Sequence, residues 1–538
     1  MVSTATARSL MASNINSGSP KDITAADVRA VFGATLDAID RTGNGSVNVM
    51  DYGAVLNGVT DDTAAWNAAL ATGKTVYFPE GSSIITNRLE FPYLEGAAIV
   101  GAGRNKSFFL ISHATFNMAA TAVIQMNSAY QGLHGFCMRF VQPTTTIRAN
   151  IKQYPVAINI NGHSRAELSR LRIEAATDGI LAAGNCGGAV IDDIQIAALR
   201  RGAFFDGSYD SIRINRWHFW PFGLTADAGL MSIWGDGQTI CMDFGKVDDL
   251  NISSILTYQG RIIFGNYGSG GVFGVGSNIT LDADYGRLEF NAGEMTVSNI
   301  YDSTAAVDDY AIRQTGGELR ISGLALEGGH NGNFGMVNVE GGVFAATNIY
   351  FYSESNTVQP FRQSGGYMTL SNGKFREVSN APRPIPMISI TGGRAVITGM
   401  IAQERTGGTG SFIGVSNDDH HIIAHNSFVG WAMDLPASPV LGLYGPNNNV
   451  ASPFVNNVLV GPSRVKRLTG TLDGGGGASV IHGIADAANR VMGIFAYYTN
   501  ASAVMVPIAG ITFNATNVII AAGASGVSRP YVLQITYT

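Results

Sequence analysis

Residues 277–281 are Ser-Asn-Ile-Thr-Leu, and close copies of this motif recur as Ser-Asn-Ile-Tyr at 298–301 and Thr-Asn-Ile-Tyr at 347–350. Each copy places two small or polar residues inside an alternation of apolar ones. The residue after that pair recurs at Leu171, Ile194, Trp217, Ile255, Ile279, Ile300, Leu324, Ile349, Gly373, Met400 and Ser427. The spacing is 21–27 residues, except for one interval of 38. A period in the twenties, with strand-forming residues and no helical stretch between copies, predicts an all-β solenoid.

Composition agrees with a solenoid and excludes several functions. The chain has 538 residues, of which 67 are glycine and only 14% are charged. Its net charge of −6, without a basic run, makes nucleic acid a poor partner. Cys137, Cys186 and Cys241 are too few and too scattered for a disulfide framework or a zinc site, so we expect buried thiols, a reducing compartment for folding, and no metal or cofactor. The N-terminus has no apolar stretch typical of a signal peptide, so none is expected. No apolar run is long enough to span a membrane, so membrane insertion is not expected either.

Residues 1–46 differ from the repeats and are predicted to form a separate segment. A polar stretch covers residues 9–20. An amphipathic helix is expected to follow an N-cap near residues 24–27, with Val28, Val31 and Leu36 on its apolar face.

Residues 47–98 carry a second set of motifs. They are Asp-Tyr-Gly-Ala at 51–54, Gly-Val-Thr-Asp-Asp-Thr-Ala-Ala at 58–65, and Val-Tyr-Phe-Pro-Glu-Gly at 76–81. This set resembles the entry cap of the pectate-lyase-like β-helix proteins, in the branch that includes phage tailspikes. We expect the cap to be structural, with a helix that covers the open end of the solenoid.

The resemblance implies a right-handed parallel β-helix, with its body at 99–433. A linker is predicted at 434–470. A small C-terminal β-sandwich is predicted at 471–538, where apolar and polar residues alternate between turns. The resemblance further implies a homotrimer in a phage virion, assembled in the host cytoplasm. Its N-terminus would contact other tail proteins, and its C-terminal domain would close the trimer or contact glycan.

The repeat also predicts which side chains face outward. If the aligned hydrophobic residue points inward, the residues one and three positions later point out, and they stack along the face at about 4.8 Å per repeat. In the middle repeats these positions are aromatic and acidic rather than ordinary solvated residues. The candidate substrate-binding residues are His218, Trp220, Trp234, Tyr258, Tyr301, Tyr350, Tyr352 and Arg376.

Two carboxylates on this face are candidates for glycoside hydrolysis. Asp282 and Glu327 stand two repeats apart in one column, which predicts about 9–10 Å between their backbones. Inverting glycosidases separate their carboxyl groups by about 6.5–9.5 Å. Asp302 lies between them at a position that should point inward, and it is the reserve catalytic carboxylate. The alternative is that these acids only cap turns or bind neighbouring arginines.

The interval of 38 residues marks an insertion that begins at Trp217. It contains Trp220, Trp234 and a Trp-Pro-Phe-Gly turn at 220–223, which resembles a segment of phage depolymerase β-helices. Insertions in repeats form loops on one face, often the binding face. The alternative is that the tryptophans pack the loop onto the body.

The predicted function is a tailspike depolymerase that cleaves a bacterial capsule, exopolysaccharide or O-antigen, with Asp282 and Glu327 as acid and base. A polysaccharide lyase is the first alternative, with a base among His218, Tyr301, Lys374 and Arg376. The others are an adhesin that binds glycan without cutting it and a secreted cellular β-helix enzyme. The Asp-Asp-His-His run at 418–421 is expected to be a solvated turn, because neighbouring side chains alternate faces.

Overall fold

The computed structural model describes most of the chain after residue 44. The described ranges are 45–265, 270–283, 285–303, 310–327, 335–377, 383–403, 410–417, 421–427 and 431–434, followed by the strands between Gly442 and Tyr537. The helix predicted after residues 24–27 lies outside them. The chain divides into two compact units, residues 1–251 and 252–538, and each is considered by itself.

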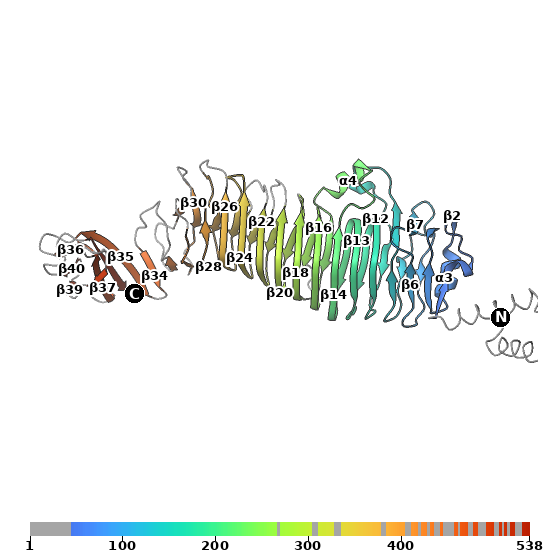
Figure 1. Ribbon diagram of the computed structural model, residues 1–538, viewed down its shortest axis with the longest axis horizontal. Helices are drawn as coiled ribbons and strands as arrows, with labels where there is room; N and C mark the ends of the chain where they lie inside the picture. Colours follow the sequence, from blue (N-terminus) through green and yellow to red (C-terminus); the bar gives the residue numbers. More distant parts are fainter. Residues whose placement is uncertain are drawn as a thin grey trace, which may run out of the picture. The chain divides into compact units, whose positions relative to one another are not determined.

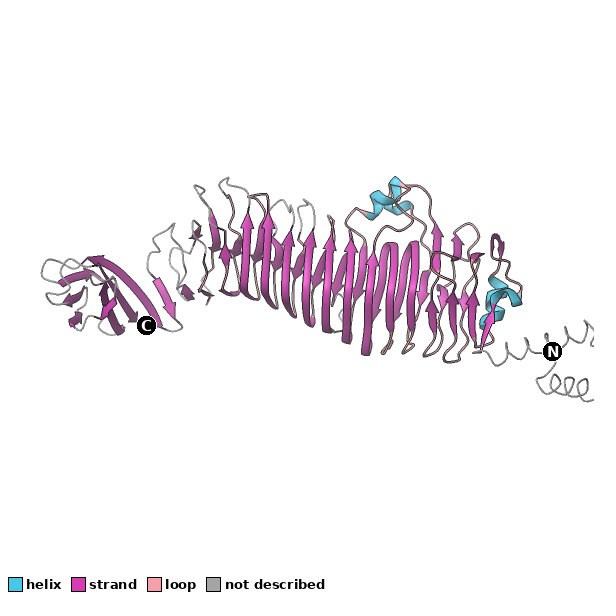
Figure 2. Cartoon of the chain, in the orientation of Figure 1, coloured by secondary structure: helices cyan, strands magenta, loops and turns pink. Residues whose placement is uncertain are grey.

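The first unit is built almost entirely of strands, which are short up to β11 and long from β12 to β14 (Figures 1 and 2). Its strands are β1 (Ser46–Asn48), β2 (Asn57–Asp61), β3 (Thr75–Phe78), β4 (Gly81–Ile84), β5 (Leu89–Glu90), β6 (Ala98–Gly101), β7 (Ser107–Ser112), β8 (Ala122–Gln125), β9 (Gly132–His134), β10 (Cys137–Val141), β11 (Val156–Asn159), β12 (Glu167–Ala183), β13 (Val190–Asp206), β14 (Ser208–Phe219) and β15 (Ile240–Phe244). Its described helices are η1 (Val49–Tyr52), α3 (Thr63–Leu70), η2 (Arg148–Asn150) and α4 (Ala228–Trp234).

From β16 (Val247–Tyr258), which spans the boundary, to β27, the second unit alternates one long strand with one short strand. Its solenoid strands are β17 (Arg261–Phe264), β18 (Val272–Asp282), β19 (Arg287–Phe290), β20 (Gly293–Ser303), β21 (Ile312–Gln314), β22 (Glu318–Glu327), β23 (Gly335–Val339), β24 (Val343–Ser353), β25 (Gln359–Gln363), β26 (Tyr367–Glu377), β27 (Ile388–Ile390), β28 (Arg394–Thr398), β29 (Ile401–Ala402), β30 (Ser411–Val415), β31 (His421–Ala424), β32 (Ala432–Asp434) and β33 (Gly442–Tyr444).

The predicted parallel β-helix is confirmed in both units. Within each unit, strands pair in parallel with strands of the preceding and following turn of the solenoid, here called a coil. In the first unit Leu171 lies beside Ile194, which lies beside Trp217. In the second unit the aligned residues pair in the predicted order from Ile279 through Gly373. Parallel pairing already begins at β1 and β3, inside the segment predicted as the entry cap.

The predicted register fails at the last repeat. Ser427 forms its bridge with Ile401 and not with Met400, so the alignment there is wrong by one residue. A one-residue slip moves a side chain to the opposite face of a strand.

A left-handed residue explains the polar pair in the repeated motif. The residue just before each aligned hydrophobe has a positive φ, between 52° and 89°, in ten successive copies: Arg170, Asp193, Arg216, Ser254, Asn278, Asn299, Gly323, Asn348, Asn372 and Gly399. A single residue in this conformation bends the strand, so that apolar residues three apart both point inward. Asn and Gly are frequent here because they tolerate a positive φ better than other residues do.

The entry cap closes the first coils with one large side chain. Trp66 of α3 is fully buried, and its ring lies 4.8 Å from the rings of both Phe78 and Phe109. The indole N–H donates to the Ser83 hydroxyl, which in turn donates to the Asp62 carboxylate. Replacing such a buried aromatic residue by alanine costs roughly 3–5 kcal/mol. The Asp-Asp-Thr motif therefore has a structural role, as predicted.

The C-terminal strands are antiparallel, in agreement with the predicted β domain. One sheet has the order β34 (Asn457–Val460), β35 (Ser463–Thr471), β41 (Pro530–Tyr537), β37 (Val491–Thr499), β38 (Met505–Pro507); the other has β36 (Gly477–Ile481), β40 (Asn517–Ala521), β39 (Gly510–Phe513). The strands begin inside the segment predicted as a linker at 434–470.

We predict that stability depends on which residue occupies the positive-φ position of each bend. Asn348 has φ 55° and an exposed side chain. Asn348→Val is expected to lower the free energy of unfolding by about 1–2 kcal/mol, because a β-branched residue resists this conformation. Asn348→Gly is the control and is expected to leave stability nearly unchanged. Thermal unfolding followed by circular dichroism measures both, and equal losses would contradict the explanation.

Candidate functional site

The outward face of the second unit gathers acidic, aromatic and basic residues in neighbouring coils. We call this set the acidic–aromatic face; it consists of Asp282, Tyr301, Ser303, Glu327, Tyr350, Tyr352, Lys374 and Arg376. The register places them in two columns. Asp282 lies beside Ser303, and farther along the column Glu327 lies beside Tyr352, which lies beside Arg376. All eight side chains retain exposed surface, as the sequence predicts.

Tyr301 and Glu327 form the central contact of this face. The phenol O–H of Tyr301 donates to Glu327 Oε2 at 3.0 Å, although the two residues are separated by 26 positions. Partial burial, this hydrogen bond and the negative charges of Glu327, Asp282 and Asp302 raise the pKa of Tyr301. The phenol therefore remains protonated and holds one oxygen of the Glu327 carboxylate in place.

Asp282 is held by two donors. Its Oδ1 accepts the backbone N–H of Ala283 at 2.8 Å and the Ser303 hydroxyl at 3.0 Å. Ser303 belongs to the next coil, so Asp282 and Glu327 are two coils apart, with backbones separated by about 9–10 Å. The two carboxylates thus share one face, and each has a fixed hydrogen-bond partner.

The far end of the face is basic. The Arg376 guanidinium lies 5.6 Å from the centre of the Tyr352 ring, whose hydroxyl donates to Glu354 at 3.1 Å. Lys374 and Arg376 are exposed, and among the described residues neither forms an ion pair. Tyr350 lies beside Lys374. A ring and two available cations therefore lie within one to two coils of Glu327.

The structure corrects the role predicted for Asp302. Its side chain is fully buried in the interior of the coil, between Leu281 and Leu326 in the register. The inward direction agrees with the sequence prediction. However, a group without exposed surface cannot meet a polysaccharide on the outside, so Asp302 is withdrawn as the reserve catalytic carboxylate. Tyr258 is half-buried at the corresponding outward position of β16.

The first unit places the predicted residues His218 and Trp220 in an aromatic cluster. The His218 ring lies 5.8 Å from the Trp220 ring and 5.0 Å from the Phe222 ring. Burial, together with the positive charge of Arg104, lowers the pKa of His218. The imidazole is therefore neutral at pH 7 and can accept a proton.

Glu174 is a buried carboxylate that the sequence did not single out as a site. Only 3% of it is exposed, and it accepts a 2.7 Å bond from Arg139 and lies 3.6 Å from Arg172. The turn at Gly223 covers it: a Cβ at this position would lie 2.9 Å from Glu174 Oε2. Because the insertion covers the face here, periodicity alone could not predict this burial.

The insertion also corrects the role predicted for Trp234. This residue ends α4, is fully buried, and stacks on Phe219 with ring centres 4.5 Å apart. Trp234 therefore packs the insertion onto the solenoid and has no exposed surface to offer a sugar. The alternative, that the tryptophans pack the loop onto the body, is correct for Trp234.

Arg148 binds the insertion to the rest of the first unit, where α4 stands on the upper edge in Figure 1. Its guanidinium makes two 2.6 Å bonds to the Asp236 carboxylate. It also donates to the backbone carbonyls of Leu199 and Ile233 and to the Thr239 hydroxyl. This one side chain thus connects η2 to β13, to α4 and to the residues that follow α4.

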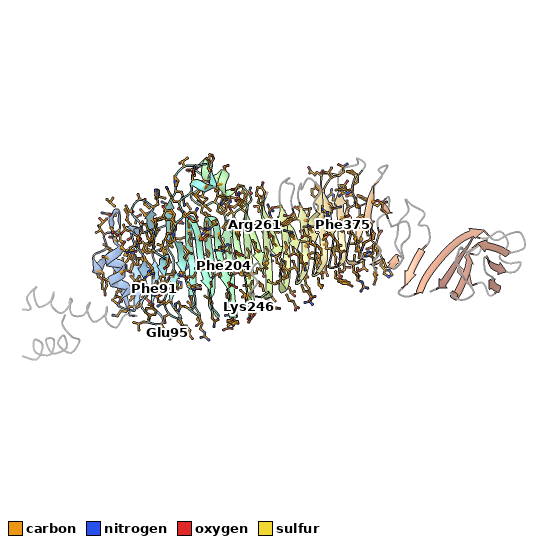
Figure 3. All side chains as sticks on the ribbon, turned by 180° about the vertical axis from the view of Figure 1, so that it is seen from behind. Phe91, Glu95, Phe204, Lys246, Arg261 and Phe375 are labelled. Atoms are coloured by element: carbon orange, nitrogen blue, oxygen red, sulfur yellow. The ribbon has the colours of Figure 1, made fainter. Side chains whose placement is uncertain are left out.

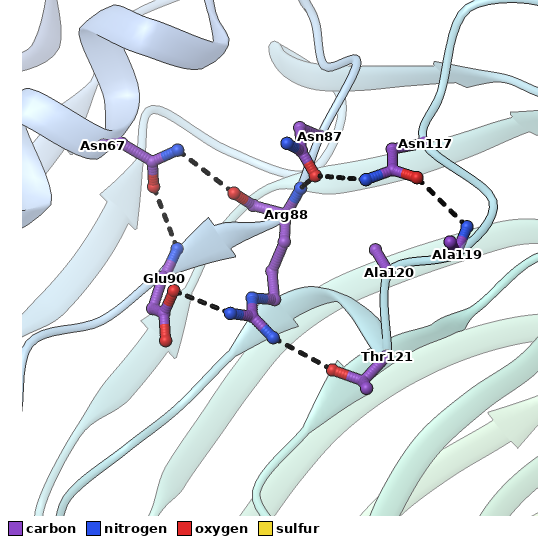
Figure 4. Close-up of a pocket in the computed structure, with 8 residues that line it drawn as sticks. All are labelled: Asn67, Asn87, Arg88, Glu90, Asn117, Ala119, Ala120 and Thr121. Atoms are coloured by element: carbon purple, nitrogen blue, oxygen red, sulfur yellow. Dashed lines mark hydrogen bonds and ion pairs between the residues drawn. The ribbon is translucent and has the colours of Figure 1, made fainter.

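Figure 4 shows an open cavity of about 550 Å³ beside the entry cap. Its polar side chains mostly bind one another. Arg88 donates to Glu90 and to Thr121, and Asn117 donates to Asn87. It contains no aromatic ring, and its polar groups already have partners. These contacts account for the lining without a ligand.

The remaining sequence features carry no site in the part of the chain that the structure describes. No group of three metal-ligating side chains occurs there, and no helix there is long and apolar enough to cross a membrane. In the Asp-Asp-His-His run only His421 is described; it begins β31, is buried and accepts the backbone N–H of Ala395, so the expected solvated turn is wrong at this residue. The three cysteines are buried free thiols.

Comparison with known families and proteins agrees with the resemblance noted from the entry cap. Residues 46–215 match the family model described as rhamnogalacturonase A/epimerase, pectate lyase-like. A pre-neck appendage protein of Bacillus phage B103 is 37% identical over 68 residues, which is 13% of this chain and only 8% of that protein. Residues 46–215 are thus similar to a pectate-lyase-like family, as the entry-cap motifs predict, and a 68-residue stretch is similar to a phage appendage protein.

Two solved structures of phage proteins are similar to this chain at low scores. The N-terminal fragment of gene product 12 of bacteriophage Phi29 has 12% identity and a TM-score of 0.39, with 78% of this chain and 69% of that chain covered. The tailspike protein gp49 of Pseudomonas phage LKA1 has 11% identity and a TM-score of 0.37, with 91% and 99% covered. These scores are too low to transfer a site.

We predict that Arg148 controls the order of the insertion. Arg148→Met removes the donors to Asp236 and to two carbonyls, and should cost roughly 2–3 kcal/mol locally. Hydrogen exchange in the segment 225–239 is expected to rise. Arg200→Met is the matched control, because Arg200 is exposed and its pair with Asp178 is worth at most about 1 kcal/mol. Unchanged exchange in Arg148→Met would contradict the prediction.

Proposed function

We propose that the protein is a phage tailspike that binds and cleaves a bacterial surface polysaccharide by glycoside hydrolysis. The acidic–aromatic face carries the proposal. It combines two held carboxylates with tyrosine rings on one outward surface. The phage origin of the relative that matches over 68 residues supports this context, as does the match of residues 46–215 to a family named for a rhamnogalacturonase and an epimerase.

In this proposal Asp282 and Glu327 divide the two steps of an inverting reaction. One protonates the glycosidic oxygen as the bond breaks, and the other takes a proton from the attacking water. A backbone separation of about 9–10 Å leaves room for that water, since inverting enzymes hold their carboxyl groups about 6.5–9.5 Å apart. Tyr301 positions Glu327 through its 3.0 Å bond, and Ser303 positions Asp282.

Tyr350, Tyr352, Tyr258 and Arg376 are proposed as subsites. Aromatic rings pack against the apolar faces of sugar rings, and a guanidinium binds carboxylates in a bidentate manner. Lys374 and Arg376 are proposed to bind a negatively charged substituent on the sugar next to the cleaved bond. His218 and Trp220, on the first unit considered by itself, are proposed as further sugar-binding residues.

A polysaccharide lyase is the second candidate, and one observation favours it. His218 has a lowered pKa, so it can remove the proton next to a uronate carboxylate at neutral pH. Tyr301 is a poorer base, because its pKa is raised and its proton is already donated to Glu327. An adhesin that binds glycan without cleavage is the third candidate.

The assembly follows from the same resemblance and is likewise proposed. The protein would be a homotrimer in the virion tail, assembled in the host cytoplasm. Residues 1–46 would contact other tail proteins, and the C-terminal β domain would close the trimer or bind glycan.

We predict that the two carboxylates are essential for cleavage but not for folding. Asp282→Asn and Glu327→Gln are each expected to lower the rate of reducing-end release from a cleaved capsular polysaccharide by at least about 100-fold, the usual contribution of a general acid or base. Binding of the same polysaccharide should persist. Glu294→Gln is the matched control: it removes a half-exposed carboxylate that pairs with Arg320 and lies before the bend of β20, the strand between those of Asp282 and Glu327.

Three results would contradict this assignment. Full activity in either carboxylate variant would remove that residue from the mechanism. Equal loss in Glu294→Gln would point to a structural effect. No cleavage of any polysaccharide in a panel of capsules, exopolysaccharides and O-antigens, with binding retained, would favour the adhesin.

We further predict that the products contain no unsaturated sugar. Hydrolysis adds water across the bond, whereas β-elimination leaves a double bond that absorbs in the near ultraviolet. Absorbance recorded during cleavage should remain flat while reducing ends increase. A rise in absorbance that disappears in His218→Ala would establish the lyase and overturn hydrolysis.

A further inference from the structure

A second cavity lies at a corner of the first unit, where one coil turns into the next. Its volume is about 360 Å³, and its lining residues are Tyr130, Arg165, Glu167, Gly188, Asp210, Ser211 and Arg213. This is within the range of about 300–1,000 Å³ that small-molecule sites occupy. None of these residues belongs to the acidic–aromatic face.

Backbone pairing aligns the lining from coil to coil. The N–H of Tyr130 donates to the Ser164 carbonyl, and the N–H of Arg165 donates to the Gly187 carbonyl. Gly188 keeps the cavity open, since a Cβ there would lie 2.7 Å from Cγ of Arg165. Glu167 and Arg213 both pair with Val190, so they stand on either side of it. Pairing between coils therefore holds the backbone that carries the lining side chains.

The two arginines of the cavity differ from most others in the first unit. Arg139, Arg172, Arg200 and Arg216, for example, each lie within 4 Å of a carboxylate. Within the described residues neither Arg165 nor Arg213 has such a partner, and both are exposed. Two guanidinium groups beside one cavity therefore remain able to bind an anion from solution.

The cavity also offers an aromatic ring and acceptors for hydroxyl groups. Tyr130 is 48% exposed, and the Arg165 guanidinium lies 5.4 Å from its ring centre. Glu167 and Asp210 are exposed carboxylates, and Asp210 already accepts the Ser211 N–H. Tyr130 and Arg165 both have a positive φ, near 58° and 57°, which is unusual for such large residues.

A second ring with a cation stands next to the cavity. Tyr209 precedes the lining residue Asp210, is 64% exposed, and has the Lys246 ammonium 4.4 Å from its ring centre. Figure 3 labels Lys246 on the lower edge of the molecule, whereas α4 stands on the upper edge in Figure 1. This corner is therefore separate from the edge that carries the insertion.

We propose that this corner cavity is a second saccharide site, which binds an acidic sugar residue. Arg213 and Arg165 bind its carboxylate, because planar guanidinium groups match carboxylate geometry. Glu167 and Asp210 accept its hydroxyl groups, and Tyr130 packs against the ring. The inference rests on the proposed function only in taking a saccharide as the ligand; it requires no cleavage at Asp282 or Glu327.

The test measures binding of glucuronate to the full chain by saturation-transfer NMR and calorimetry, in the Glu327→Gln background. Arg213→Met and Tyr130→Asn are each expected to weaken binding by about tenfold or more, since each removes charge-assisted or stacking contacts. Asparagine tolerates the positive φ at position 130. Arg216→Met, three residues along the same strand, is the control and should bind as the parent does. Glucose should bind at least about tenfold more weakly than glucuronate.

Each other outcome overturns the inference. Absence of glucuronate binding, equal binding of glucose, or equal loss in Arg216→Met would each reject an acidic-sugar site here. A changed oligomeric state of Arg213→Met in light scattering, without saccharide binding in the parent, would assign the corner to a contact between copies of the chain. Melting temperatures of all variants exclude misfolding, and cleavage by the wild-type chain tests the proposed function independently.

Discussion

The structure depends on one backbone bend that recurs in ten successive coils. A single residue with positive φ separates two strand segments and lets apolar residues on both sides of it point inward. Where this residue is asparagine, its amide can bind its counterpart in the next coil: Asn299 donates to Asn278 at 3.1 Å. Where it is glycine, as at Gly323, a Cβ would lie 2.7 Å from the Asn299 amide oxygen. The bends therefore contact one another from coil to coil, and they fix the register that every later feature uses.

A fixed register turns distant residues into neighbours. Tyr301 and Glu327 are 26 positions apart, yet they are hydrogen-bonded because each stands a set number of residues after its own bend. The same counting brings Ser303 to Asp282. In a solenoid each coil contacts only its neighbours, so a site on its surface is assembled from short local pairings. One misplaced bend would separate the carboxylates from the donors that hold them.

Sequence reasoning was most accurate where periodicity decides the structure. It predicted the parallel β-helix, the pairing from Leu171 to Trp217 and from Ile279 to Gly373, and the inward direction of Asp302. It placed the break at residue 217 but not the contents of the insertion. Burial of Trp234 and Glu174 depends on a loop that folds back over the solenoid, and the repeat pattern does not predict such a contact. The left-handed bends were also missed, although the small polar pair in each motif was their signal.

The two carboxylates of the acidic–aromatic face illustrate how the coil and the chemistry constrain each other. A strand spacing of about 4.8 Å offers carboxylates only certain separations: one coil is close to the 5–5.5 Å of retaining glycosidases, and two coils are close to the inverting range. Asp282 and Glu327 take the second, and the coil between them supplies Tyr301 and Ser303 as donors to the two acids. Asp302 belongs to this middle coil but points inward, so it does not lie between the two acids on the outer face. In the proposed hydrolysis, the two-coil spacing of Asp282 and Glu327 corresponds to the inverting range and not to the retaining one.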